Sequence, residues 1–141
     1  MKKYITVLAF IMPLVFSTSF VQEFDLKASI QKGKSIYETQ CLSCHMSEGE
    51  GLEGVYPPLA KVDYLMNKEK LVQTILKGVR GPITILGKEY NAEMSGIELT
   101  NQETSDLINY VRNSFGNKAP AVLPKEIQPA LKVKVQNYQP Y

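Results

Sequence analysis

Apolar side chains recur at helical spacing in three segments of the chain. The first covers residues 29–40, the second follows Asn67, a suitable N-cap, and the third follows Thr100, which forms a capping box with Glu103. The three apolar stripes are Ile30, Gly33, Ile36 and Tyr37; Leu71, Val72, Ile75, Leu76 and Val79; and Leu107, Ile108, Val111 and Phe115, before Gly116. No strand-rich segment or repeat appears among them, so the pattern predicts an all-α domain.

The composition changes after the third segment. Four prolines fall between Asn117 and Tyr141, which makes a continuing helix implausible. Residues 131–135 alternate in a way that predicts a short strand or an extended arm. We interpret residues 118–141 as a Pro-rich C-terminal extension, which either lies over the preceding domain or docks on an acidic partner.

Residues 1–19 have the layout of a secretory signal peptide. Lys2 and Lys3 precede an apolar run over residues 7–16, and small polar residues follow. The run is shorter than the roughly 18 residues of a membrane-spanning helix, so we expect cleavage near Phe20. The mature protein is then periplasmic or otherwise exported, and it associates with a membrane only if the signal stays uncleaved.

The charge balance excludes one class of partner. The chain has 16 basic and 14 acidic residues, and removal of the signal takes away two lysines, leaving a net charge of about zero. A neutral chain gives no case for nucleic-acid binding.

Both cysteines and the single histidine lie in the pentapeptide CLSCH, which comprises Cys41, Cys44 and His45. Structural zinc needs four protein ligands, and these three residue positions are all the cysteine and histidine the chain has. A thioredoxin-like dithiol follows a strand, whereas a helical pattern precedes this motif. A disulfide or a dithiol stays open as an alternative.

Covalent attachment of haem c is the third interpretation of this motif. Two thiols separated by two residues on a turn can form thioether bonds to the two haem vinyl groups, and His45 then presents its imidazole to the iron. The opposite face of the iron needs Met94, Met66, a lysine or an open position. We favour Met94, because it lies between predicted helices in a glycine-flanked loop, whereas Met66 directly precedes a helix.

These residues resemble the class I c-type cytochromes over residues 25–117. Besides CLSCH, Gly33 and Tyr37 resemble the glycine and the aromatic residue of that family's N-terminal helix, and Leu107 and Tyr110 resemble its C-terminal helix. The resemblance implies an all-α class I cytochrome c fold, in which three or more helices pack around one covalently bound haem c.

The resemblance also implies roles for individual residues. Pro57 or Pro58 in YPPL matches a proline whose carbonyl accepts a hydrogen bond from the haem histidine, and Leu59 matches a haem-packing leucine. Tyr90 resembles a residue that flanks the methionine loop. Arg80 is our first candidate for pairing with a haem propionate, because propionates need cationic or donor partners.

The predicted function is one-electron transfer between redox proteins through a haem ligated by His45 and Met94, rather than enzymatic catalysis. The resemblance suggests an extracytoplasmic dehydrogenase, reductase or oxidase as partner. Two alternatives stay open. A haem enzyme or gas sensor would follow if Met94 left the iron open, and a haemless thiol oxidoreductase would follow if Cys41 and Cys44 stayed free.

Overall fold

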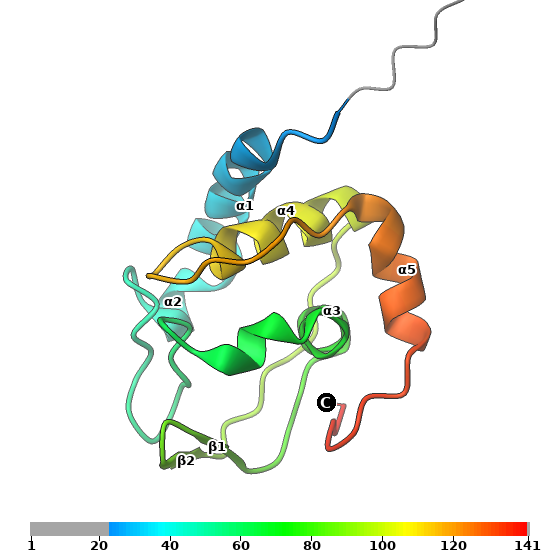
Figure 1. Cartoon of the computed structure of the whole chain (residues 1–141). Coiled ribbons are helices and arrows are strands. Elements are labelled where there is room, and N and C mark those ends of the chain that lie inside the picture. Colours follow the sequence, from blue (N-terminus) through cyan, green and yellow to red (C-terminus); the bar gives the residue numbers. More distant parts are fainter. Residues whose placement is uncertain (1–22, 141) are drawn as a thin grey trace, which may run out of the picture.

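The computed structural model describes residues 23–140, so the predicted signal over residues 1–19 lies outside the described part of the chain (Figure 1). The elements are α1 (Leu26–Gln40), α2 (Leu42–His45), the 3-10 helix η1 (Asp63–Met66), α3 (Lys68–Lys77), β1 (Ile83–Ile85), β2 (Lys88–Tyr90), α4 (Asn101–Arg112) and α5 (Pro124–Lys132). The predicted mostly helical architecture is confirmed. Within residues 23–140, no helix is both long enough and apolar enough to cross a membrane.

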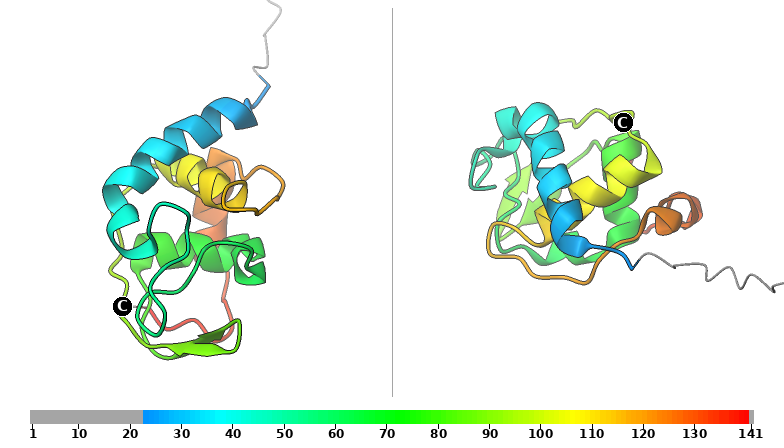
Figure 2. Two further views of the ribbon diagram at one scale, coloured as in Figure 1. Left: turned by 90° about the vertical axis from the view of Figure 1, so that its left-hand side faces the viewer. Right: turned by 90° about the horizontal axis from the view of Figure 1, so that it is seen from above.

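The crossing of α1 and α4 forms one end of the molecule, with α3 below it and the hairpin at the other end (Figure 2). Gly33 lets the two helices approach closely, because a Cβ placed there would lie 1.9 Å from the carbonyl oxygen of Asp106. Tyr37 is 1% exposed, and its ring packs against Tyr110 and Phe115 at centroid distances of 5.3 Å.

Helix α3 begins where the sequence predicts and ends sooner. The side chain of Asn67 accepts a hydrogen bond of 2.8 Å from the backbone N–H of Lys70, so it caps the helix. The helix ends at Lys77, because Gly78 takes a left-handed φ of 73°. Inclusion of Val79 in the helical stripe was therefore wrong, since it lies past the helix end in a backbone bridge.

Helix α4 also begins where the sequence predicts and ends sooner. Both hydrogen bonds of the predicted capping box of Thr100 and Glu103 are present. The helix ends at Arg112, before Phe115 and Gly116, which corrects the predicted end. Asn113 leaves the helical conformation, and its side chain donates back to a carbonyl of the last turn.

A short antiparallel hairpin, which the sequence pattern did not predict, follows α3 within this mostly helical fold. Ile83 pairs with Tyr90, and Ile85 pairs with Lys88. The loop Leu86–Gly87 has positive φ at both positions, 50° and 77°, as a type I′ turn requires. Three-residue strands are too short to give a clear alternating pattern in the sequence.

The C-terminal extension contains a helix, α5, which the sequence did not predict. It overlaps residues 131–135, for which a short strand or an extended arm was predicted, only at Leu131 and Lys132, and the backbone at Val133 is extended. Pro124 stands in its first turn, where a missing N–H costs nothing, although Pro129 falls inside it. The helix forms because Ile127 (0% exposed) and Ala130 (3%) become buried against α3 and α4. The extension therefore lies over the preceding domain.

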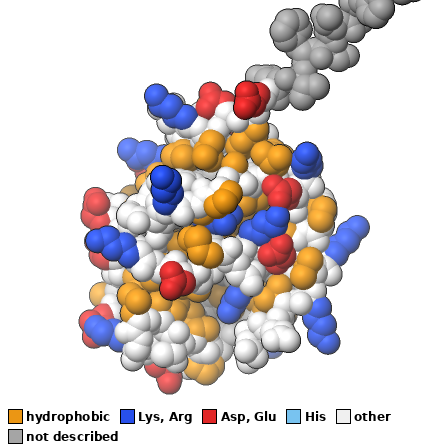
Figure 3. Space-filling model, viewed as in Figure 1, with side chains coloured by type: hydrophobic (Ala, Val, Ile, Leu, Met, Phe, Trp, Pro, Cys, Tyr) orange, Lys and Arg blue, Asp and Glu red, His pale blue; other side chains and the backbone are white. Residues whose placement is uncertain are grey.

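The surface carries charges of both signs. On the face seen in Figure 3, basic and acidic side chains are interspersed with apolar ones. Lys88 forms an ion pair with Glu53, and Lys68 forms one with Glu126. This face therefore shows no large region of a single charge.

Candidate functional site

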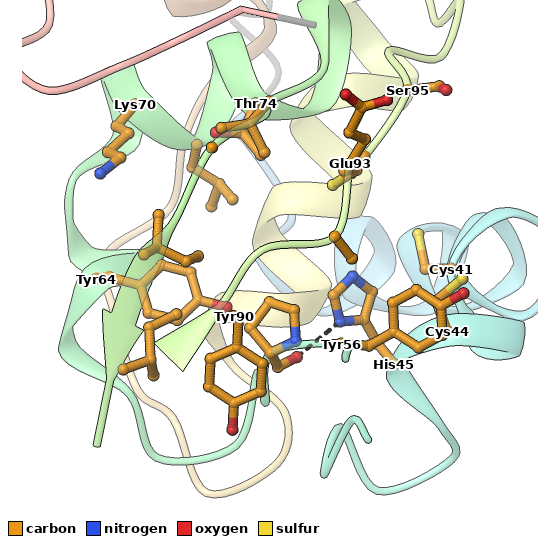
Figure 4. A pocket seen from close by; sticks show the side chains of 18 of the residues that line it. Cys41, Cys44, His45, Tyr56, Tyr64, Lys70, Thr74, Tyr90, Glu93 and Ser95 are labelled. Atoms are coloured by element: carbon orange, nitrogen blue, oxygen red, sulfur yellow. Dashed lines mark hydrogen bonds between the residues drawn. The ribbon is translucent and has the colours of Figure 1, made fainter. Parts of the chain in front are cut away.

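A cavity of about 460 Å³ lies between α2, α3, the hairpin and the segment that leads to α4. This volume falls within the range of roughly 300–1,000 Å³ usual for ligand and cofactor sites. Figure 4 shows its polar side chains. Its wall is mostly apolar and includes Leu71, Val79, Ile83, Ile85 and Ile97.

The motif CLSCH enters the cavity from a single helical turn. Cys41 terminates α1, and the backbone N–H groups of Cys44 and His45 donate to its carbonyl at 3.2 and 2.9 Å. Positions three and four apart share one face of a helix, so Cys41, Cys44 and His45 all line the cavity. Both cysteines are free thiols, and burial raises the pKa of Cys41 to about 11.

His45 is buried and held by one backbone carbonyl. Its Nδ1 lies 3.0 Å from the carbonyl oxygen of Pro57, drawn as the dashed line in Figure 4. Burial lowers the pKa of His45, so the neutral ring is favoured. A neutral imidazole that donates from Nδ1 carries its lone pair on Nε2, which makes Nε2 the atom able to ligate a metal.

Gly51 leaves room for the Pro57 carbonyl. Its N–H donates to the carbonyl of His45 at 3.1 Å, and a Cβ at this position would lie 2.7 Å from the carbonyl oxygen of Pro57. Only a residue without a side chain fits here, and φ of 66° also favours glycine. The loop over residues 51–57 thus holds His45 at two points, its backbone carbonyl through Gly51 and its ring through Pro57.

Met94 reaches the cavity from the segment after the hairpin. Its side chain is half-buried and lines the cavity, and its backbone pairs with Val79. Met66, by contrast, is 41% exposed at the end of η1 and does not line the cavity. Of these two methionines, only Met94 shares a space with His45.

The other predicted site residues divide into two groups. Pro57 and Tyr90 line the cavity, and Tyr90 is 5% exposed. Leu59 is buried in the hydrophobic core and Arg80 is exposed, and neither lines the cavity. The structure thus brings together Cys41, Cys44, His45, Pro57, Tyr90 and Met94.

Several polar side chains at the cavity were not predicted as site residues: Gln40, Tyr56, Tyr64, Lys70, Thr74, Thr84, Glu93 and Ser95. The Tyr64 hydroxyl donates to the carbonyl of Pro58 at 2.8 Å. Lys70, Leu71 and Thr74 share one face of α3, whereas Val72 and Ile75 face the core. Leu71 belongs to the core as well as to the cavity wall, so only the packing of α3 reveals these positions.

The donor set fits haem c better than a metal ion held by protein alone. Over residues 23–140, no three His, Cys, Asp or Glu side chains are grouped to hold a metal. The cavity instead offers two thiols, one imidazole nitrogen and one thioether in an apolar wall. These are the groups that attach and axially ligate an iron whose other four ligands belong to a macrocycle.

Comparison with known proteins agrees with this donor set. The family model of cytochrome c matches residues 30–115. Cytochrome c-552 of Thermus thermophilus is 34% identical over 91 residues, which cover 60% of this chain and 69% of that protein.

Two further relatives are much longer proteins. The cytochrome c subunit of alcohol dehydrogenase (quinone) of Gluconacetobacter polyoxogenes is 32% identical over 99 residues, covering 64% of this chain and 20% of the subunit. The fructose dehydrogenase cytochrome subunit of Gluconobacter japonicus is 32% identical over 91 residues, covering 60% of this chain and 19% of the subunit. The chain therefore spans about a fifth of either subunit. With the family match, the fold and the CxxCH cavity together, the chain belongs to the cytochrome c family of electron carriers, in which haem c is held covalently.

Proposed function

We propose that this protein is an exported one-electron carrier with a single haem c, ligated by His45 and Met94. The observation that carries the proposal is the convergence of Cys41, Cys44, His45 and Met94 on one mostly apolar cavity. The pattern of residues 1–19 supports export, because a basic start is followed by an apolar run and small polar residues.

In this proposal each residue has a defined task. Cys41 and Cys44 would form the two thioether bonds, and His45 would ligate through Nε2 while Pro57 holds the proton on Nδ1. Met94 would supply the second axial ligand through its sulfur. When bound, haem c supplies an iron that accepts and releases one electron.

The apolar wall influences the reduction potential. Burial in a low-dielectric site disfavours extra charge, so the less charged reduced state gains relative to the oxidised state. A thioether ligand acts in the same direction. We therefore expect a potential well above that of a solvent-exposed haem.

Lys70 is a better candidate than Arg80 for pairing with a propionate. Lys70 lines the cavity and is half-buried, whereas Arg80 is exposed outside it. A half-buried ammonium group interacts more strongly with a carboxylate than an exposed one does.

Redox proteins are the proposed partners. The printed names of two relatives associate a similar cytochrome segment with an alcohol dehydrogenase and a fructose dehydrogenase. We propose that this chain exchanges electrons with an extracytoplasmic dehydrogenase, reductase or oxidase, through a small and short-lived interface.

Spectroscopy of the purified protein tests the ligation. We expect haem that resists acid-acetone extraction and an oxidised-state band near 695 nm, which in this family accompanies methionine ligation. Met94→Leu should abolish the band, because leucine has a similar volume and no sulfur. Met66→Leu is the matched control and should keep it.

Two results would contradict the proposal. Extractable or absent haem, with both thiols reactive, would indicate a thiol oxidoreductase. Covalent haem without the 695 nm band in the unmodified protein would indicate an open iron position, as in a haem enzyme or gas sensor.

A further inference from the structure

The chain beyond the family match bonds back onto α3. We define the C-terminal strap as residues 133–140, which follow α5 and end beneath the C-terminal end of α3 (Figure 1). The Tyr138 hydroxyl lies 2.9 Å from the carbonyl oxygen of Gln73 and 2.6 Å from that of Gly78. The N–H of Arg80 donates to the carbonyl of Gln139 at 3.0 Å. The strap therefore fixes the backbone on both sides of Val79.

Hydrogen bonds from α3 also hold the end of α5, which leads into the strap. The side-chain amide of Gln73 donates to the carbonyls of Ala130 and Val133 at 3.0 and 2.7 Å, and Nζ of Lys77 donates to the carbonyl of Leu131 at 3.2 Å. Gln73 is 4% exposed, so its two hydrogen bonds are shielded from water. The end of α5 and the end of α3 therefore move as one unit.

The strap also reaches the wall of the cavity. Gly81 lines the cavity, and a Cβ on it would lie 2.6 Å from Oε1 of Gln139. The absence of a side chain at Gly81, where φ is 89°, thus makes room for the strap.

The backbone of residues 78–80, which the strap fixes, pairs with Met94. The N–H of Val79 donates to the carbonyl of Met94 at 2.8 Å, and the N–H of Met94 donates to the carbonyl of Val79 at 2.9 Å. Val79 stands directly between Gly78 and Arg80, which are the two points that the strap holds. A shift of this segment therefore shifts the backbone of Met94.

We infer that the C-terminal strap positions Met94 at the haem iron, with Tyr138 as the principal positioning residue. The inference rests on the proposed function, because it takes Met94 as the axial ligand. Without the strap, the Val79–Met94 bridge opens more often, and the sulfur leaves the iron for a larger fraction of the time.

Three forms of the holoprotein test this inference against the unmodified one. Tyr138→Phe removes one hydroxyl, and a truncation after Gln136 removes the anchoring residues Tyr138 and Gln139. Lys134→Ala is the matched control, because its exposed side chain lies in the same segment. Hydrogen exchange reports on the bridge at the amides of Val79 and Met94. Imidazole binding to the oxidised iron reports on the methionine, since imidazole binds only where the sulfur has left.

We expect Tyr138→Phe and the truncation to accelerate exchange at Val79 and Met94 by about tenfold or more. The apparent affinity for imidazole should rise by a similar factor. On heating, the 695 nm band should weaken at a lower temperature than it does in the unmodified protein. Lys134→Ala should match the unmodified protein. The amides of Leu107 and Tyr110 in α4 should keep their exchange rates in all forms.

Each other outcome overturns the inference. Unchanged exchange at Val79 and Met94 would show that the strap does not hold the bridge, and an equal acceleration in α4 would show only a general loss of stability. Faster exchange with unchanged imidazole affinity would show that the bridge does not position the sulfur. Failure of the proposed function is recognised separately, because the unmodified protein would then lack the 695 nm band while the exchange measurement still tests the strap.

Discussion

Gly33 determines how closely α1 and α4 approach each other. A Cβ at this position would lie 1.9 Å from the carbonyl oxygen of Asp106 and 2.7 Å from Cβ of Tyr110. Both are on α4, and a backbone carbonyl cannot rotate away as a long side chain can. The helices must separate to admit even one methyl group.

We therefore expect Gly33→Ala to destabilise the holoprotein by about 3 kcal/mol, despite a gain of about 1 kcal/mol in helix propensity. Urea unfolding followed by far-UV circular dichroism measures the difference. Gly54→Ala is the control, because nothing lies within 4 Å of its Cβ position and only its φ of 72° opposes alanine. It should cost about 1 kcal/mol. Equal losses in the two variants would contradict a steric role for Gly33.

The residues of the site show what local sequence can predict. The spacing of Cys41, Cys44 and His45 places them on one helical turn, so their convergence on one cavity needs no tertiary information. Lys70 and Tyr64 lie at the same cavity, but only the packing of α3 and η1 brings them there. Local spacing thus indicates the attachment motif, whereas the rest of the cavity wall depends on how the elements pack.

At the scale of elements, the starts of α3 and α4 were predictable and their ends were not, whereas α1 ends at Gln40 as predicted but begins at Leu26, three residues before the predicted start. The starts of α3 and α4 depend on the caps Asn67 and Thr100, whose side chains bond within three residues. The end of α4 depends on Asn113 and on contacts made by the following loop. Helix α5 contains Pro129, and it forms because tertiary burial of its apolar face outweighs the local preference.

The segment that leads to α5 is fastened to α4 by Asn109, which is 0% exposed. Its Nδ2 donates to the carbonyl of Val122 at 3.0 Å and to Oγ of Ser29 at 3.0 Å, and its Oδ1 accepts from the N–H of Val122 at 2.8 Å. One side chain therefore joins α1, α4 and the C-terminal extension.

Asn109→Ala should destabilise the holoprotein by about 2–3 kcal/mol, because the buried N–H of Val122 loses its partner. Gln128→Ala is the control. Its side chain is exposed and bonds only to Asn101 among the described contacts, so we expect a change within about 0.5 kcal/mol. Chemical denaturation monitored by circular dichroism compares the two variants. A loss below about 1 kcal/mol for Asn109→Ala would argue against this fastening role.

At the scale of the whole molecule, the cavity divides the fold into two parts. Helices α1 and α4 pack directly on each other through Tyr37, Leu107 and Tyr110. Helix α2, the hairpin and the Met94 segment meet mainly around the cavity. The second part therefore depends directly on the group that fills the cavity, and the first part depends on it through α3, which lines the cavity and packs against α4.

The size of the cavity predicts the behaviour of the apoprotein. At about 24 cal/mol per Å³, a dry void of 460 Å³ would cost roughly 11 kcal/mol, which is comparable with the roughly 5–15 kcal/mol stability of a whole domain. Water admitted beside Tyr56, Lys70 and Thr74 lowers this cost but solvates the apolar wall instead. We expect the variant Cys41→Ala/Cys44→Ala, prepared colourless, to lose most of its far-UV helical signal and to unfold without a cooperative transition in urea. The unmodified holoprotein should unfold cooperatively under the same conditions. A colourless variant with full helicity and a sharp transition would show that the helices do not need the haem.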